Sequence, residues 1–414
     1  MALIPRVEFA TLVREHKAER HARGFTCWAQ FLAMMFCQFG RANSLREICG
    51  GLATCEGKLR HLGLSDAPKR STLAYANEHR PWELYRDLFY TLQRRFTAEA
   101  AGAVKKGTGR AHHFRFKNKL LSMDASTIAL TLSVFDWAHY QRAKGAVKLH
   151  MVLDHDGYLP SYAVITTGKT HDIKVARGIK FDAGTVVVFD KGYLDYKWWQ
   201  QLDQQGVFFV SRLKKDAKFT VIQDRDIPPT QKHILKDQEI VLPGWRQLGK
   251  EGLALRRIEV WLEDKQEVLV LVTNHPRLAA STIAAVYKDR WQIETFFKCI
   301  KQLLKVKTFV GTSQAAVMTQ IWTALIVMLL LRWLRLKSAY GWSLSNLIAM
   351  LRMQLFVYRD LWTWLNNPFE GPPQLVTADQ LLLPLTGTTH SGQQQTIEKQ
   401  TSISRSTKLA HLVQ

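Results

Sequence analysis

The spacing of apolar residues changes at about residue 120 of the chain. Before that point apolar positions recur three and four residues apart, which predicts amphipathic helices over residues 26–39, 44–53 and 81–96. Several short helices with a basic lead-in, KRSTLAYANEHR, are typical of helix-turn-helix DNA-binding units, although a helical bundle with a solvated basic face fits the same pattern. We favour a helical DNA-binding domain over residues 1–103, followed by a basic linker over residues 104–119.

Beyond residue 120 the pattern indicates strands that alternate with helices. LLSMDASTIALTLS has the alternation of one strand or a pair of strands, and AVKLHMVLDHDGYLPSYAVIT predicts a hairpin that turns at Asp156-Gly157. The continuous apolar run in GTVVVFDKGY is typical of a central, buried strand, and the segment after it has helical spacing. The expected fold class is therefore α/β, a mixed sheet covered by helices.

The second half of the chain contains a β-rich stretch followed by helices. Residues 219–274 hold four strand-like pieces separated by Pro, Gly and charged turns, which predicts a β-rich insertion. Helices return at residue 281, and we expect a C-terminal helical region over residues 341–384. Residues 385–414 are rich in Ser, Thr and Gln, a composition that predicts a disordered tail.

One apolar run, IWTALIVMLLL, is the longest in the chain and ends at Arg332. It is too short to cross a bilayer and predicts a buried helix. The N-terminal sequence has no continuous apolar stretch of the signal-peptide type. We therefore expect a cytoplasmic protein without a membrane partner.

The charge of the chain points to its partner. Lys and Arg number 57 against 35 Asp and Glu, which leaves a formal net charge of +22. So large a positive field favours a polyanion, and without a membrane segment the expected polyanion is nucleic acid. The 5 cysteines contain no C-x-x-C pair, so neither a zinc site nor a disulfide scaffold is indicated.

The segment YKDRWQIETFFKCIKQLLK gathers charge on one side of a helix predicted over residues 287–305. Positions three and four apart share a helical face, and this face comprises Tyr287, Arg290, Glu294, Lys298, Lys301 and Lys305. A solvated face, with Glu294 and Lys298 as an ordinary pair, is the plain alternative. A single carboxylate among cations instead favours a metal ligand beside bound phosphates.

Two aspartates occupy strand positions in the same part of the chain. Asp124 lies in LLSMDAST, and Asp190 ends VVVFD just before a glycine turn. A carboxylate that closes a buried strand lies where open sheets place their active sites, whereas a lone aspartate is often only a turn or cap residue. Together with Glu294, the two aspartates would supply the hard oxygen ligands that Mg²⁺ prefers.

These residues carry a resemblance to a known family. Asp124, Asp190 and Glu294, with the pattern Tyr-x2-Arg-x3-Glu-x6-Lys that ends at Lys301, resemble the bacterial DDE transposases of insertion-sequence family four. The resemblance begins near residue 120 and is looser over the N-terminal hundred residues. It implies an RNase H-like catalytic domain over residues 120–340, with the β-rich insertion between the second aspartate and the glutamate.

The resemblance also implies a function, metal-dependent cut-and-paste DNA transposition. Two Mg²⁺ ions, for which Mn²⁺ can substitute, are held by the acidic triad and promote cleavage at the element ends. In the resembled family the freed 3′-hydroxyl attacks the opposite strand to give a hairpin, which is hydrolysed to regenerate the 3′-hydroxyl before strand transfer into target DNA. The implied partners are double-stranded DNA, as terminal inverted repeats and as target, and a second copy of the chain in a homodimer at the nucleoid.

The resemblance further assigns residues that hold DNA. The phosphate contacts expected from the resemblance and from the charged face are Tyr287, Arg290, Lys298, Lys301 and Arg212. A tryptophan of the insertion, either Trp245 or Trp261, is a candidate for stacking a flipped base, a contact worth ~1–3 kcal/mol. Both tryptophans fit a core role equally well.

Two other functions stay open. The chain could be a regulatory, non-catalytic DNA-binding derivative of a transposase, although a regulator does not require three separated metal ligands. It could also be a structure-selective nuclease on an RNase H-like scaffold, although such a nuclease has little use for a separate helical end-reader.

Overall fold

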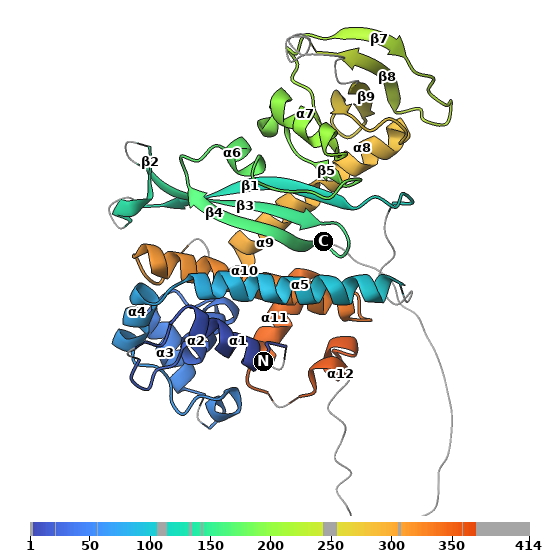
Figure 1. The fold of residues 1–414 in the computed structure, drawn as a ribbon. Helices are drawn as coiled ribbons and strands as arrows, with labels where there is room; N and C mark the ends of the chain where they lie inside the picture. Colours follow the sequence, from blue (N-terminus) through green and yellow to red (C-terminus); the bar gives the residue numbers. More distant parts are fainter. Residues whose placement is uncertain are drawn as a thin grey trace, which may run out of the picture. The chain divides into compact units, whose positions relative to one another are not determined.

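The structure is a computed structural model of the chain, shown in Figure 1. It describes residues 3–20, 22–55, 57–105, 114–131, 135–141, 144–242, 255–304, 308–357 and 359–369. The predicted disordered tail therefore lies outside the described residues. One compact unit covers Met1–Pro368, and the following description concerns that unit alone.

The described residues before residue 114 form helices only: α1 (Arg6–Glu15), α2 (Cys27–Gly40), α3 (Leu45–Ala53), a 3₁₀ helix at Leu59–Leu62, α4 (Arg70–His79) and α5 (Glu83–Lys105). Side chains that accept from backbone N–H groups fix two of the helix starts. Thr26 caps α2 through Ala29 N, and Ser44 caps α3 through Glu47 N at 3.2 Å. The helix α5 runs on to Lys105, well past the predicted end at residue 96. Part of the predicted basic linker is thus helical, and residues 106–113 lie outside the described residues.

A ten-stranded mixed sheet follows, in the order β2-β3-β1-β5-β6-β10-β9-β8-β7, with β4 paired to β3. Its strands are β1 (Leu120–Leu130), β2 (His139–Gln141), β3 (Lys144–Asp154), β4 (Leu159–Thr167), β5 (Val186–Val188), β6 (Phe208–Arg212), β7 (Thr220–Asp224), β8 (Ile234–Val241), β9 (Leu255–Leu262) and β10 (Glu267–Thr273). The strands β1, β5 and β6 run parallel, and the other pairs are antiparallel. The α/β class with a mixed sheet is confirmed.

The stretch at residues 219–274 extends this sheet. Its four strands, β7 to β10, join the rest through the antiparallel pair β10–β6, in which Leu271 lies opposite Arg212. The hairpin β3–β4 turns where the sequence predicts it, with φ angles of +87° at Gly157 and +56° at Tyr158. Glycine adopts such a φ without strain, which explains its place in the turn.

The remaining described helices are α6 (Asp172–Ala176), α7 (Tyr196–Gln204), α8 (Ala280–Asp289), α9 (Trp291–Leu303), α10 (Gln314–Lys337), α11 (Leu344–Gln354) and α12 (Leu361–Asn366), as well as a 3₁₀ helix at Asp136–Ala138. In α10 every residue from Ala316 to Leu334 is buried. This helix is long and apolar enough to cross a membrane, yet 89% of its apolar window is buried in the protein. The prediction of a buried helix is confirmed.

The helices before the sheet and the sheet itself share one hydrophobic core. Both α2 and α5 pack against α10, and α5 and α10 also contact β4 (Figure 1). The rings of Phe89 and Trp322 lie 5.5 Å apart, and the hydroxyl of Tyr90 donates to Ala163 O at 2.8 Å. The division at residues 103–120 therefore does not separate two cores, and its functional meaning stays a prediction.

Candidate active site

Asp124 lies on β1, and Asp190 lies two residues after the end of β5, the parallel neighbour of β1. The strand register pairs Leu120 with Val186 and Ser122 with Val188. The same register, continued by two residues, would bring Asp124 level with Asp190 at the usual strand spacing of about 4.8 Å. The parallel pairing of β1 with β5 thus puts the two aspartates on adjacent segments of the chain.

The backbone around Asp190 is fixed by three hydrogen bonds. Phe189 N–H donates to Val210 O at 3.2 Å, and the Ser211 hydroxyl donates to Asp190 O, also at 3.2 Å. The Asp190 side chain accepts from Gly192 N at 2.8 Å, which begins a short 3₁₀ helix at Lys191–Tyr193. Asp190 is therefore both a strand-end carboxylate and the cap of the turn that follows.

The predicted helix over residues 287–305 is interrupted at Arg290. The helix α8 ends at Asp289 and α9 begins at Trp291. Arg290 N–H donates to Tyr287 O at 3.2 Å, and Ile293 N–H donates to Arg290 O at 3.0 Å. Both bonds span three residues and not four, so the backbone is tightened as in a 3₁₀ turn. The expectation of one continuous helix is wrong at this point, and residue 305 lies outside the described residues.

Arg290 joins two of the three predicted acidic residues. One guanidinium nitrogen lies 3.5 Å from Asp124 Oδ2, and the other pairs with Glu294 Oε1. The Arg290 side chain is only 12% exposed, so these contacts are shielded from bulk water. The structure thus brings Glu294, from α9, to the β1 strand that carries Asp124, although 170 positions separate the two residues in the sequence.

Tyr287 and Arg212 border the same site. Tyr287 is buried, and its ring centre lies 5.6 Å from the Arg290 guanidinium carbon, within the range of a cation–π contact. Burial raises the pKa of Tyr287, while the charges of Arg290 and Arg212 oppose that rise. Arg212 therefore lies close enough for its charge to act on Tyr287, and its contact with a DNA phosphate stays a prediction.

Asp124 titrates abnormally because of its surroundings. The pKa of Asp124 is raised to about 6, mainly by burial and in smaller part by the negative charges of Asp190 and Glu294, against the opposing effects of the Ala125 N–H bond and Arg290. Asp190 and Glu294 are therefore near enough for their charges to act on Asp124. A cation placed between such carboxylates would offset their mutual repulsion.

The structure also shows a residue at this site that sequence reasoning missed. Tyr193 closes the turn after Asp190, and its buried hydroxyl has no hydrogen-bond partner among the described residues. Burial raises the pKa of Tyr193, and the charges of Asp124, Asp172 and Asp190 add to the rise. The signal in the sequence was its position three residues after a strand-end aspartate, in the turn that such an aspartate caps.

Other predicted site residues lie further along their elements. Lys298 is exposed and Lys301 half-buried, about one and two helical turns beyond Glu294 on α9. Trp261 is half-buried on β9, four strands from β1 or about 19 Å along the sheet. Trp245 lies outside the described residues.

The donor atoms of the site suit a hard divalent metal by type. All three acidic residues offer carboxylate oxygens, the ligands that Mg²⁺ and Mn²⁺ prefer. Within the described ranges, no three acidic, His or Cys side chains are gathered as a metal-binding group. Arg290 contacts Asp124 and Glu294 instead, and Asp190 is turned to Gly192.

Comparisons with known proteins match both parts of the chain. Residues 115–330 match a family described as Transposase DDE domain, and residues 1–65 match a domain of unknown function. A putative transposase, y4zB, from Sinorhizobium fredii is 32% identical over 290 residues, 69% of this chain and 77% of that protein. A probable transposase for insertion sequence element IS5377 from Geobacillus stearothermophilus is 29% identical over 246 residues, 59% of this chain and 64% of that protein.

A solved structure is similar over most of the chain. It is a piggyBac transposase synaptic complex with hairpin DNA, which covers 90% of this chain and 81% of its own at 10% identity, with a TM-score of 0.42.

Proposed function

Because this chain belongs to the DDE transposase family, and is therefore an enzyme of DNA transposition, we propose that Asp124, Asp190 and Glu294 are its acidic catalytic residues. The observation that carries the proposal is the Arg290 guanidinium, which pairs with Glu294 and lies 3.5 Å from Asp124. The charges of Asp190 and Glu294 also add to the raised pKa of Asp124, which supports placing all three acids in one site. An insertion-sequence transposase of family four remains our more specific prediction.

We propose that these carboxylates bind divalent metal, Mg²⁺ with Mn²⁺ as a substitute. Two such ions, when bound, polarise the scissile phosphate and stabilise the attacking and leaving oxygens of an in-line displacement. Asp124 and Asp190 would hold metal from the sheet and Glu294 from α9. The Asp124 side chain is only 20% exposed, and this partial burial strengthens the electrostatic interactions of the carboxylate.

We propose that Arg290 pairs with the carboxylates in the free protein and with a DNA phosphate in the complex. It neutralises Asp124 and Glu294 as the structure stands. Its planar fork suits a phosphate equally well, so a bound strand with its metals offers Arg290 an alternative partner. Tyr287 supports the guanidinium from one side, and Arg212 adds positive charge near Tyr287. Lys298 and Lys301 extend positive charge along α9.

The wider assembly is proposed on chemical grounds. A net charge of +22 suits long contacts with DNA backbones. We propose that the sheet and the helices α9 and α10 form an RNase H-like catalytic core, and that the helices up to residue 103 read the element ends. Pairing of two ends calls for a homodimer in the DNA complex, and the proposed cut-and-paste route proceeds by hydrolysis, hairpin formation, hydrolytic opening of the hairpin and strand transfer.

A nicking assay tests the proposed triad. The full chain is incubated with DNA that carries the element's terminal repeats, in Mg²⁺ or Mn²⁺. We expect Asp124→Asn, Asp190→Asn and Glu294→Gln each to reduce nicking at least 10³-fold while binding to the same DNA persists. The exposed variant Asp264→Asn, in the turn between β9 and β10, is the matched control and should nick as the native chain does. Full nicking by any one of the three would remove that residue from the triad.

A further inference from the structure

A buried hydrogen-bond chain connects β1 to the break between α8 and α9. Its members are Ser122 on β1, His155 in the β3–β4 turn and Asp289 at the end of α8. The Ser122 hydroxyl lies 2.6 Å from His155 Nε2, and His155 Nδ1 lies 2.6 Å from Asp289 Oδ2. The three residues are brought together across 33 and 134 positions of sequence.

The direction of these bonds follows from the chemistry of the groups. An ionised Asp289 carboxylate can only accept, so the imidazole donates to it from Nδ1, and the tautomer that carries its hydrogen there accepts at Nε2 from the Ser122 hydroxyl. The Tyr158 hydroxyl donates to Asp289 as well, at 3.0 and 3.2 Å from its two oxygens. Each polar group of the chain is thus matched to a partner of the opposite kind.

Hydrolytic triads also consist of a serine, a histidine and an aspartate joined in this order. The location of Ser122 nevertheless excludes it as a nucleophile. Ser122 is fully buried at 0% exposure and His155 is 7% exposed, so a substrate does not reach the hydroxyl. The strands on both sides of β1 are hydrogen-bonded to it as well. The hydrogen-bonded residues therefore contact other parts of the protein and not a substrate.

The position of this hydrogen-bond chain next to the proposed catalytic residues indicates its role. Ser122 precedes Asp124 by two residues, and Asp289 directly precedes Arg290, five residues before Glu294. We propose that Ser122, His155 and Asp289 are positioning residues that fix the separation between Asp124 and the Arg290–Glu294 segment. This inference rests on the proposed function, since the separation matters only if Asp124 and Glu294 share metal.

Further contacts hold the β3–β4 turn, which carries His155, in place. His155 N–H donates to Leu120 O at 3.1 Å, and Lys119 pairs with the neighbouring, buried Asp154 at 2.8 Å. Arg332 of α10 donates to Tyr158 O at 2.7 Å. The turn that carries His155 is therefore attached to β1 and to α10, so it holds Asp289 at a fixed distance from the sheet.

Such support is expected to matter for a metal site. Groups behind the metal ligands typically change metal affinity or activity by 10- to 100-fold when they are removed. A shift of the Arg290–Glu294 segment by about 1 Å is enough to lower a rate about 10²-fold. Removal of the imidazole should therefore lower the metal affinity and the nicking rate, although His155 makes no contact with DNA.

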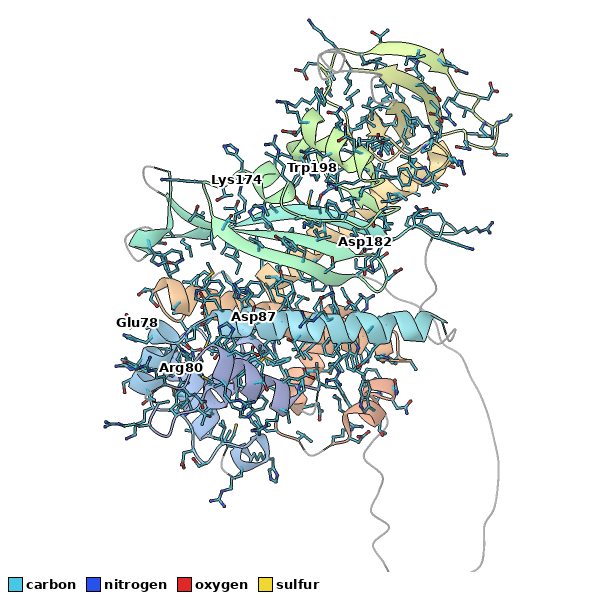
Figure 2. The ribbon with its side chains drawn as sticks, in the orientation of Figure 1. Glu78, Arg80, Asp87, Lys174, Asp182 and Trp198 are labelled. Carbon is cyan, nitrogen blue, oxygen red and sulfur yellow. The ribbon has the colours of Figure 1, made fainter. Side chains whose placement is uncertain are left out.

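The test compares His155→Ala with a matched pair elsewhere. The control is His16→Ala, which removes a His–Asp contact of 2.8 Å to Asp87 on α5 (Asp87 is labelled in Figure 2). His16 follows α1, and neither α1 nor α5 carries a triad residue. We expect His155→Ala to raise the Mn²⁺ concentration for half-maximal nicking at least 10-fold and to lower kcat 10- to 100-fold. Direct Mn²⁺ binding, followed by the resonance signal of free Mn²⁺, should weaken in parallel. His16→Ala should change thermal stability alone.

Two milder variants keep the test decisive if His155→Ala does not fold. Ser122→Ala removes one hydroxyl and should raise the Mn²⁺ requirement about 3-fold. Asp289→Asn keeps an acceptor for the imidazole and should retain activity within about 3-fold. If Ser122→Ala loses stability while its Mn²⁺ affinity and its rate per folded molecule stay native, the positioning role is wrong.

A parallel Glu294→Gln sample distinguishes failure of the proposed triad from failure of the proposed positioning role. If Glu294→Gln loses Mn²⁺ binding and nicking while His155→Ala does not, the triad is supported and the positioning role of Ser122, His155 and Asp289 is wrong. If Glu294→Gln itself binds Mn²⁺ and nicks normally, the proposed triad is wrong.

Discussion

Replacement of Asp124 by asparagine should make the metal-free protein more stable. The carboxylate is 20% exposed, and burial among other acids raises its pKa from 3.8 to about 6. At pH 8 the native chain keeps this group ionised at a cost of on the order of 3 kcal/mol, since each pKa unit corresponds to about 1.36 kcal/mol. Asparagine carries no charge, and its Oδ1 can still accept from Ala125 N, which lies 2.8 Å from the present carboxylate.

The sign of the pH dependence follows from the raised pKa. Between about pH 4 and pH 6 the folded chain binds more of the proton at Asp124 than the unfolded chain does. The free energy of unfolding therefore falls as the pH rises through this window, and the loss is complete above pH 6. The difference between Asp124→Asn and the native chain should be near zero at pH 4 and reach about 1–3 kcal/mol at pH 8.

Urea unfolding followed by tryptophan fluorescence measures this difference, in a chelator, at pH 4.5, 6 and 8. The exposed Asp264→Asn serves as the control and should match the native chain at each pH. Added Mg²⁺ should stabilise the native chain and leave Asp124→Asn unchanged, because only the native chain retains the full ligand set. A variant less stable than the native chain at pH 8, or a difference that does not change with pH, would refute the reasoning.

Two further predictions address the turn after Asp190 and the insertion. A Cβ at Gly192 would lie 2.8 Å from Asp190 Oδ1, so Gly192→Ala should push this carboxylate aside and slow nicking at least 10-fold, with a melting temperature within about 2 °C of native. Gly50→Ala, where a Cβ meets open space, is its control, and equal rates for both would contradict the argument. Arg256 pairs with Asp237 at 2.5 Å, both about 5% exposed, so Arg256→Ala should cost about 3–5 kcal/mol in urea unfolding. A loss below about 1 kcal/mol would show that the pair is not needed for the fold.

Local patterns were sufficient to predict much of the sheet. The alternation around Asp124, the apolar run before Asp190 and the Asp156-Gly157 turn are set by neighbouring residues, so the sequence shows them directly. Tyr287, Arg290 and Glu294 also contact one another as their spacing predicts, because these contacts span only about two turns of helix. These features needed no knowledge of distant contacts.

Features made by distant contacts could not be predicted in the same way. The break at Arg290 coincides with Asp289 being held by His155 and Tyr158, which are more than 130 positions away. The buried Ser122 looked like any polar residue of a strand. Helical spacing also shows that a face is buried without showing against what, so the shared core of α2, α5 and α10 stayed hidden.

The convergence of three acids on shared metal can be measured directly. In the full chain Fe²⁺ replaces Mg²⁺, and peroxide then generates hydroxyl radicals that cut the backbone beside the bound iron. The account predicts cuts near Asp124, Asp190 and Glu294 together, all suppressed by excess Mg²⁺ and all lost in Glu294→Gln. Cuts confined to other segments, or cuts near these residues that persist in Glu294→Gln, would contradict it.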